Sequence, residues 1–228
     1  MRVLAIDTAL ATCAAAVLDG EGGDIRAREA QAMQRGHAEA LMPLIARVMQ
    51  RAGLGFDDLD RIAVTVGPGS FTGLRVGIAA ARGIALASGK PVIGVTTLAA
   101  YAAPFVLSDK TRPVVAAVDA RHDHVYLKIV GPGGHLLVAP RIAGLREAVQ
   151  RAAASGSPLL VGDAAALLAA AWPADEVPPA SVAQQPAPDI DWVARLGAVA
   201  EEAGAPVKPL YLRPPDAQPQ AAAQLPRR

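Results

Sequence analysis

The residues whose types and spacing could do chemistry are concentrated in the glycine-rich loop Gly67–Gly73, with the sequence GPGSFTG. This loop joins an apolar run to a helical pattern, and backbone N–H groups at such a helix start can face an anion such as a phosphate. It lacks the lysine of a Walker loop, and its three glycines do not have the spacing of the dinucleotide fingerprint. The alternative is a tight turn in which Gly73, Gly77 and Ala81 let the helix pack closely, and we favour this packing role.

An acidic residue at the end of the first apolar run suggests a second chemistry. Asp7 and Thr8 could hold a metal–nucleotide complex, as in kinases whose first strand ends in an acid. Together with the Gly67–Gly73 loop they would support a small-molecule kinase. Such sites usually have glycines in the following turn, whereas this sequence has alanine and leucine at residues 9–11. A structural hydrogen bond from Asp7 or Thr8 to a turn is an equally good interpretation.

Histidine and cysteine, which supply most metal and nucleophilic chemistry, are scarce. The chain has four histidines and one cysteine, Cys13, so an internal disulfide and a cysteine-rich zinc site are excluded. His122 and His124 lie two residues apart between acidic neighbours, and on a strand they would share a face and form half of a metal site. The sequence offers no obvious third ligand, so we favour a polar turn between two strands.

Apolar runs and turn residues predict the elements that must position these side chains. Three strands precede the first helix, and strands and helices alternate thereafter. This β-β-β-α-β-α-β-α order is informative, because most α/β folds alternate from the outset. The expected strands are residues 2–6, 13–18, 25–31, 61–66 and 91–95, and the expected helices are residues 36–52, 71–88 and 98–106.

The second half of the chain repeats this pattern less clearly. Residues 173–188 are rich in proline and are expected to form a loop, and the Pro- and Gln-rich residues after Tyr211 are expected to fray. A boundary near residue 108 predicts two domains of similar size, residues 1–107 and residues 108–228. The expected strands of the second half are residues 113–118, 125–130, 135–138 and 158–161, and the expected helices are residues 145–154, 164–171 and 191–203.

Composition narrows the class of protein. Hydrophobic residues make up 52% of the 228 residues and aromatic residues only 4%, so the core is built from aliphatic and small side chains. The 22 basic and 21 acidic residues nearly cancel, which disfavours tight non-specific binding of nucleic acid. No apolar run is long enough to span a membrane, and polar residues occur too early for a signal peptide. We therefore expect a soluble cytoplasmic protein without a membrane partner.

Five blocks of sequence together resemble the bacterial TsaB (YeaZ) family. The most specific is residues 67–77, GPGSFTGLRVG, and the others follow the family order along essentially the whole chain: residues 2–8, residues 36–45, Asp119-Ala120-Arg121 with Val125-Tyr126, and Pro209-Leu210-Tyr211-Leu212-Arg213. The resemblance implies an actin-like ATPase (ASKHA) fold with two related α/β halves. Each half would have a mixed sheet opened by antiparallel strands, in agreement with the predicted order.

The resemblance also implies a function without catalysis by this chain. Proteins of the family are required for N6-threonylcarbamoyladenosine at position 37 (t6A37) of tRNAs that read ANN codons. They pair with the paralogue TsaD, which transfers the threonylcarbamoyl group, and the ATPase TsaE joins the complex. A homodimer is implied for the protein alone, with tRNA contacted only indirectly and no cofactor bound. The kinase that uses Asp7 and the Gly67–Gly73 loop stays as the alternative function.

Two positions support the expectation that the chain is a pseudo-enzyme. In TsaD, the strand corresponding to residues 92–95 is followed by two metal-binding histidines four residues apart, on one face of a helix. The residues here are Thr97 and Tyr101, which would deprive a metal of both imidazoles. The same substitution argues against a metallopeptidase, an older interpretation of this superfamily. We therefore expect no metal site and no catalytic residue.

The resemblance places the surface for TsaD, or for a second copy of the chain, on the two helices of residues 37–52 and 71–88. An alternative is that the apolar stripes of both helices are internal core. The expected interface residues are His37, Leu41, Leu44, Ile45, Val48, Gly73, Arg75, Gly77, Ile78 and Arg82. Residues expected to be remnants of phosphate loops are Asp7, Thr8, Gly67, Gly69 and Ser70.

Overall fold

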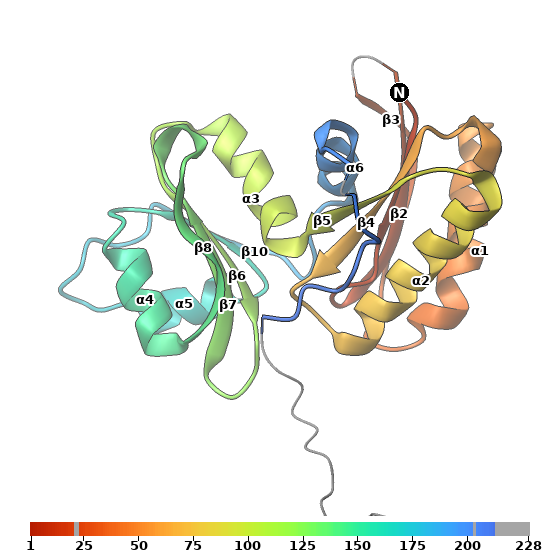
Figure 1. Ribbon diagram of the computed structural model, residues 1–228. Helices are drawn as coiled ribbons and strands as arrows, with labels where there is room; N and C mark the ends of the chain where they lie inside the picture. Colours follow the sequence, from red (N-terminus) through yellow and green to blue (C-terminus); the bar gives the residue numbers. More distant parts are fainter. Residues whose placement is uncertain (21–22, 203, 213–228) are drawn as a thin grey trace, which may run out of the picture.

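Two five-stranded sheets lie side by side in the computed structural model, which describes residues 1–20, 23–202 and 204–212 (Figure 1). The first sheet has the order β3-β2-β1-β4-β5, and the second has the order β10-β9-β6-β7-β8. The strands of the first sheet are β1 Val3–Asp7, β2 Thr12–Asp19, β3 Asp24–Ala32, β4 Arg61–Gly67 and β5 Val92–Thr96. Those of the second are β6 Val114–Asp119, β7 His124–Val130, β8 Leu136–Gly144, β9 Leu159–Gly162 and β10 Ser181–Gln184.

The two halves repeat one topology. In each, three antiparallel strands are followed by a helix, a parallel strand, a second helix, a parallel strand and a third helix. The helices of the first half are α1 His37–Ala52, α2 Phe71–Ser88 and α3 Thr97–Ser108. Those of the second are α4 Leu145–Ala153, α5 Ala165–Ala170 and α6 Ile190–Val199, with short 3-10 turns at η1 Phe56–Asp58 and η2 Pro132–Gly134. The predicted β-β-β-α order is present in both halves.

The central strand β1 is buried on both faces, which explains its uninterrupted apolar sequence. Leu4 and Ile6 pack in the core beneath α1 and α2, whereas Val3 and Ala5 pack in the core that includes α6 residues. Successive side chains of a strand point to opposite faces, so a strand between two helical layers must be apolar at every position. The sheet is therefore sandwiched, with α1 and α2 on its outer face and α6 on its inner face (Figure 1).

The third helix of each half packs on the sheet of the other half. Helix α3 contacts β6, β7 and β9, and α6 contacts β1, β2 and β4. Both helices lie between the sheets and contact each other (Figure 1). The predicted boundary after residue 107 stays a prediction. The hydrophobic contacts of α6 nevertheless tie the late part of the chain to the first sheet.

Helix ends follow local sequence. Ser70 caps α2, because its hydroxyl accepts a hydrogen bond from the Gly73 N–H at 3.3 Å. Gly53 and Gly89 close α1 and α2 in the left-handed conformation that glycine adopts without strain. Pro43 lies inside α1 without ending the helix. Each helix within the described residues is too short or too polar to cross a membrane.

The structure departs from the predicted elements in the second half. Strand β8 continues to Gly144, whereas a strand was expected only at residues 135–138, and α6 ends at Val199, whereas a helix was expected to continue to residue 203. Residues 173–188 were expected to be a loop, but they include β10, a short edge strand that pairs parallel to β9. Its exposed residues and four-residue length leave no periodic pattern in the sequence. The predicted fraying tail and Arg213 lie outside the described residues. Residues 204–212, here called the strap, return to the first half, where Val207 and Leu210 pack against its core.

Candidate functional site

The turn after β1 and the start of α2 are in direct contact, so the two predicted phosphate loops close on each other. The Thr8 hydroxyl donates a hydrogen bond to the Gly73 carbonyl at 2.7 Å, and the Ser70 N–H donates to the Ala9 carbonyl at 2.7 Å. A Cβ at Gly69 or Gly73 would overlap the carbonyl oxygen of Ala9 or Thr8, well inside the 3.0 Å that real Cβ contacts keep. These glycines therefore serve close packing of backbone on backbone.

Gly67 and Gly77 extend this packing on either side. Gly67 has a φ of 108°, in the region where a side chain is strained, and a Cβ there would also press on Leu74. Gly77 faces Thr8, and a Cβ there would overlap the threonine hydroxyl. The glycine-rich loop is thus occupied by contacts within the chain. The packing role that the sequence favoured for Gly73 and Gly77 is the one these distances describe.

Asp7 is fully buried beneath this turn. Its Oδ1 accepts hydrogen bonds from the Thr65 hydroxyl at 2.5 Å and the Ala9 N–H at 3.0 Å. Its Oδ2 has no hydrogen-bond partner among the described residues. Burial raises the pKa of the Asp7 carboxyl above its ordinary value, because the charged form loses its hydration. In this conformation the carboxyl is a structural group and cannot reach a magnesium ion in solvent.

Thr97 and Tyr101 occupy the first turns of α3 and are both buried. The Tyr101 hydroxyl donates a hydrogen bond to the Gln185 carbonyl at 2.9 Å, which links α3 to the segment after β10. Burial raises the pKa of Tyr101 far above its ordinary value, so the phenol stays neutral. The Thr97 hydroxyl has no partner among the described residues. Across residues 1–20, 23–202 and 204–212, no group of three His, Cys, Asp or Glu side chains could hold a metal ion.

An open cleft of about 360 Å³ separates the two halves at the ends of β1 and β6. On the first half it is lined by residues that include His37 and Ser70, and on the second by Asp119, Arg121 and Asp163. The His37 Nε2 lies 3.2 Å from the Leu10 carbonyl. Sequence analysis did not single out Asp163, although it directly follows Gly162, the last residue of β9, which has a φ of 114°.

The second-half wall of the cleft carries two carboxylates. The Asp119 N–H donates to the Asp163 Oδ1 at 3.0 Å, and the Arg121 guanidinium lies 3.9 Å from the Asp119 carboxylate. Burial, with the nearby Asp119, raises the pKa of Asp163 to about 6, although the Asp119 N–H hydrogen bond opposes this shift. In the repeated topology, the turn after β6 corresponds to the turn after β1. Negative charge on this wall would repel a phosphate at that turn.

The two neighbouring histidines do not form half of a metal site. Arg121, His122 and Asp123 all have positive φ, between 51° and 64°, and form the turn between β6 and β7. His124 begins β7, and its Nδ1 lies 2.6 Å from the His122 carbonyl. Because His122 lies in the turn and outside the strand, the two rings do not share a strand face. The predicted polar turn is confirmed.

Most residues predicted for the partner interface are buried in the first half. The buried ones are Leu41, Leu44, Ile45, Val48, Gly73, Gly77 and Ile78. Arg75 and Arg82 are exposed, and His37 is half-buried. The assignment to an interface stays a prediction. In this conformation a partner could contact the two arginines and His37 directly. The apolar residues of the set are buried and could only hold α1 and α2 in place beneath such an interface.

An apolar groove that the sequence pattern did not predict lies between α1 and α2. It has a volume of about 500 Å³ and is lined by Met42, Phe56, Asp57, Ala80, Gly83, Ile84, Ala87 and Ser88. Met42 is 46% exposed, although it lies within an apolar stretch of α1. Leu86, on the outer side of α2, is 89% exposed. The α2 side of the groove is formed by small residues. The pattern of apolar residues identifies the buried face of α2 and does not reveal this second surface.

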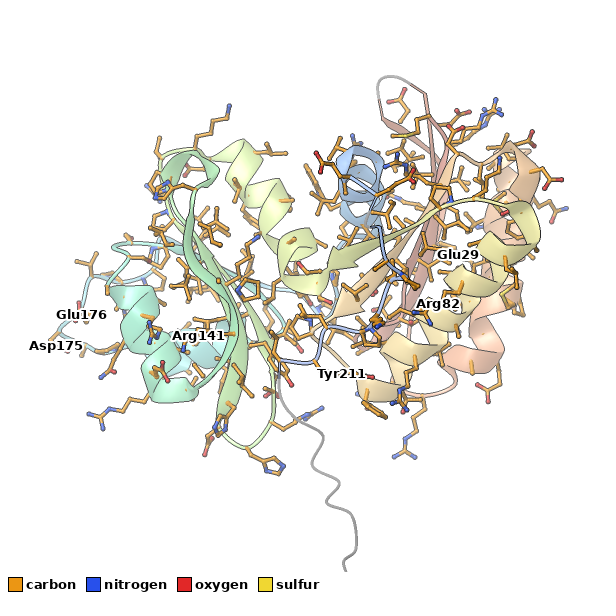
Figure 2. All side chains as sticks on the ribbon, viewed as in Figure 1. Glu29, Arg82, Arg141, Asp175, Glu176 and Tyr211 are labelled. Atoms are coloured by element: carbon orange, nitrogen blue, oxygen red, sulfur yellow. The ribbon has the colours of Figure 1, made fainter. Side chains whose placement is uncertain are left out.

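The opposite flank of α2 is covered by the strap. The Leu210 N–H donates to the Val66 carbonyl at 2.7 Å, which is available because the pairing of β4 with β5 skips Val66. The Arg82 guanidinium donates to the Val207 carbonyl. The Tyr211 ring lies 5.6 Å from that of Phe71 on α2. Figure 2 shows Arg82 and Tyr211 on this side of the first half, along the course of the strap.

Comparison with known proteins gives consistent matches. Residues 29–169 match the family model described as TsaD: tRNA N6-adenosine threonylcarbamoyltransferase. The chain is similar to the tRNA threonylcarbamoyladenosine biosynthesis proteins TsaB of Haemophilus influenzae and Escherichia coli, with 37% identity to each. These matches cover 131 residues, 57% of this chain and 54% of the Haemophilus protein, and 126 residues, 55% and 53%, for the Escherichia protein. The chain thus spans about half the length of the curated relatives it matches.

Solved structures match over nearly the whole chain. YeaZ from Pseudomonas aeruginosa is 25% identical and covers 92% of this chain and 99% of its own, with a TM-score of 0.75. A protein described as similar to peptidase YEAZ from Pseudomonas aeruginosa is 28% identical and covers 93% and 99%, with a TM-score of 0.78. The ROK hexokinase of Thermus thermophilus, 14% identical over 87% of this chain and 99% of its own, shares the fold at a TM-score of 0.50. The two halves therefore have the actin-like ATPase fold.

Proposed function

The chain belongs to the TsaB (YeaZ) branch of the TsaD family, and from that premise we propose that it is the non-catalytic partner subunit that binds and activates TsaD in t6A37 biosynthesis. The proposal includes tRNAs that read ANN codons as the substrates and TsaE as a further member of the complex. It is supported by the names of two relatives, which are tRNA threonylcarbamoyladenosine biosynthesis proteins.

The observation that carries the non-catalytic role is the burial of Thr97 and Tyr101. The family resemblance puts the two metal-binding histidines of TsaD at these positions. The Tyr101 hydroxyl is already engaged with the Gln185 carbonyl, and both side chains are nearly inaccessible to solvent. A metal here would have neither imidazoles nor an open coordination position. This arrangement supports a chain that assists a catalytic partner.

The kinase alternative is not favoured by the same geometry. A phosphoryl-transfer site needs backbone N–H groups and an acid that reach the nucleotide phosphates and their metal ion. Here the Ser70 N–H is bonded to Ala9, and the Asp7 carboxyl is buried without access to the cleft. Opening such a site would require separation of the Thr8–Gly73 contact. We therefore keep the partner role as the proposal.

The groove between α1 and α2 is the surface that we propose for TsaD. It is apolar, open and continuous with exposed Met42, and its α2 side is made of small residues that allow close approach of another helix. Exposed apolar patches on a soluble chain mark interaction surfaces. The same surface would form a homodimer when TsaD is absent, because the paralogue is expected to present an equivalent pair of helices.

Co-expression with TsaD from the same organism tests the proposal. We expect the wild-type chain to co-purify with TsaD, to elute with it on size exclusion and to be required for threonylcarbamoylation of tRNA. Met42→Glu should abolish co-purification, whereas Leu167→Glu should not, because Leu167 is an equally apolar exposed residue on α5 in the other half. Full activity of TsaD without this chain would refute the activating role. Equal binding by both variants would refute the groove.

A further inference from the structure

Residues 61–108 contain no aspartate or glutamate, although the chain as a whole is almost neutral. This stretch holds four basic residues, Arg61, Arg75, Arg82 and Lys90. The Arg61 guanidinium is committed to α6, where it donates to the Ala200 carbonyl at 2.8 Å. The other three cations belong to α2 and the turn that leads into β5. Residues 61–108 therefore bring three cations, and no acidic residue, to one flank of the first half.

The strap adds a fourth cation to this flank. Arg82 bonds to the Val207 carbonyl, and the next residue, Lys208, is exposed. Arg82, Lys90 and strap residues 205–207 line one shallow depression of about 500 Å³. The only carboxylate lining this depression among the described residues is Glu202, which lies 3.8 Å from Arg61. We call the surface formed by Phe71, Arg75, Arg82, Lys90, Lys208 and Tyr211 the strap face.

Several exposed arginines elsewhere on the first half are paired with carboxylates. Arg47 and Arg51 share Glu29, and Arg26 pairs with Asp19 at 2.5 Å. By contrast, the four cations of the strap face have no carboxylate within 4.0 Å in the part of the chain that the structure describes. Such a concentration of unpaired positive charge favours an anionic ligand.

Two aromatic rings lie at the end of the same face. Phe71 and Tyr211 are each 46% exposed, with ring centroids 5.6 Å apart. The Arg75 guanidinium lies 3.7 Å above the Phe71 ring, and its Nε donates to the Tyr211 hydroxyl at 3.3 Å. Half-exposed aromatic rings and stacked arginine planes are the surfaces on which unpaired nucleobases stack.

We propose that the strap face binds single-stranded RNA, with phosphates on Arg82, Lys90 and Lys208 and a base stacked beside Phe71 and Tyr211. The combination of unpaired cations with exposed aromatic rings favours RNA over an acidic protein segment, because RNA has bases that can stack on the rings. The face lies on the flank of α2 away from the groove proposed for TsaD, so both could be occupied together. This inference goes beyond the proposed function and does not depend on it. It differs from the expectation of only indirect tRNA contact, which the family resemblance implied.

Fluorescence anisotropy of the full-length protein with a labelled single-stranded RNA and a transcribed tRNA, in about 50 mM salt, tests this proposal. Affinity should fall with salt with a log–log slope of about −2 to −3, as expected for three or four phosphate contacts to a single strand. Lys208→Glu and Arg82→Glu should each weaken binding about tenfold or more, since each reverses a charge that neutralises a phosphate. Arg141→Glu is the matched control, because Arg141 is exposed and lies in the other half (Figure 2).

Two further arms keep the test decisive. Lys208 is exposed and its side chain has no hydrogen bond or ion pair among the described residues, so Lys208→Glu should keep the fold even if Arg82→Glu displaces the strap. Phe71→Ala should weaken RNA binding at unchanged charge. Absence of binding at low salt, equal losses for Lys208→Glu and Arg141→Glu, or displacement of the RNA by polyglutamate at equal charge would overturn the proposal. The last outcome would indicate an acidic protein partner. None of these results depends on TsaD.

Discussion

Thr8 and Gly73 hold the start of α2 against the turn after β1: the threonine hydroxyl donates to the Gly73 carbonyl at 2.7 Å, and the glycine Cα faces the Thr8 carbonyl without room for a Cβ. Both residues belong to segments where an actin-like ATPase would hold nucleotide phosphates. In this chain the same segments are joined directly, and Asp7 is sealed beneath them. Because of this contact, the turn after β1 and the start of α2 are part of the packed core.

This contact predicts a large difference between two glycines of the same helix. Gly73→Ala should lower the free energy of unfolding by about 3 kcal/mol, because backbone must move to admit the methyl group. Gly83→Ala should raise it by up to about 1 kcal/mol, since nothing lies within 4 Å of a Cβ there and alanine favours the helix. Urea unfolding with an unchanged m-value measures both. Similar effects of the two substitutions would contradict the close packing.

Neighbouring positions on α1 should separate folding from partner binding. Met42→Glu should change the free energy of unfolding by less than about 0.5 kcal/mol, because Met42 is exposed and glutamate is also a good helix former. Ile45→Glu should cost more than about 4 kcal/mol, since Ile45 is fully buried and the new charge would have no partner. Circular dichroism melting compares the two. A well-folded Ile45→Glu protein would show that this stripe is not part of the core.

The partly buried Asp163 should make stability depend on pH. Its pKa is raised to about 6 from an ordinary 3.8, so the folded state binds more protons than the unfolded state between these values. The free energy of unfolding therefore falls as pH rises through this window. Asp163→Asn should raise it at pH 7.5 by about 1–3 kcal/mol, with the gain disappearing near pH 3.5. The asparagine Oδ1 can still accept the Asp119 N–H.

Urea unfolding of the wild type and Asp163→Asn at both pH values measures this difference. Asp175→Asn serves as the control, because Asp175 is exposed on the loop after α5 (Figure 2). Its effect should be small and the same at both pH values. A gain for Asp163→Asn that persists unchanged at pH 3.5 would show that relief of a buried charge is not its cause.

Two tyrosine hydroxyls should differ in their contribution to stability. Tyr101→Phe should cost about 1 kcal/mol, because the partly buried Gln185 carbonyl loses the donor that the buried Tyr101 supplies. Tyr211→Phe should cost less than about 0.5 kcal/mol, since its hydroxyl is exposed and water can replace the Arg75 contact. Thermal unfolding at neutral pH compares them. An equal cost would mean that Tyr101 is not a buried link between α3 and the second half.

The order of the helices and strands could be predicted because it depends on local sequence patterns. The run from Val3 to Ile6, the turn at Gly20 and the helical spacing from His37 each depend on residues within a few positions of one another. Strand β10 could not be predicted, because an exposed edge strand of four residues has no periodicity. The exposed groove was missed for a related reason. A stripe of apolar residues identifies the core face of a helix, but small residues beside it do not reveal whether a neighbour covers them.

The amino-acid types alone show which residues are available for chemistry. Alanine and leucine occupy residues 9–11, and Thr97 and Tyr101 stand where imidazoles would be needed. The contacts that these residues make become visible only in the folded chain. The contact of Thr8 with Gly73 spans 65 positions, and that of Arg75 with Tyr211 spans 136. The first contact arises because β1 pairs with β4, which leads into α2, and the second arises because the strap returns to α2. Both depend on packing between distant parts of the chain, which no local pattern encodes.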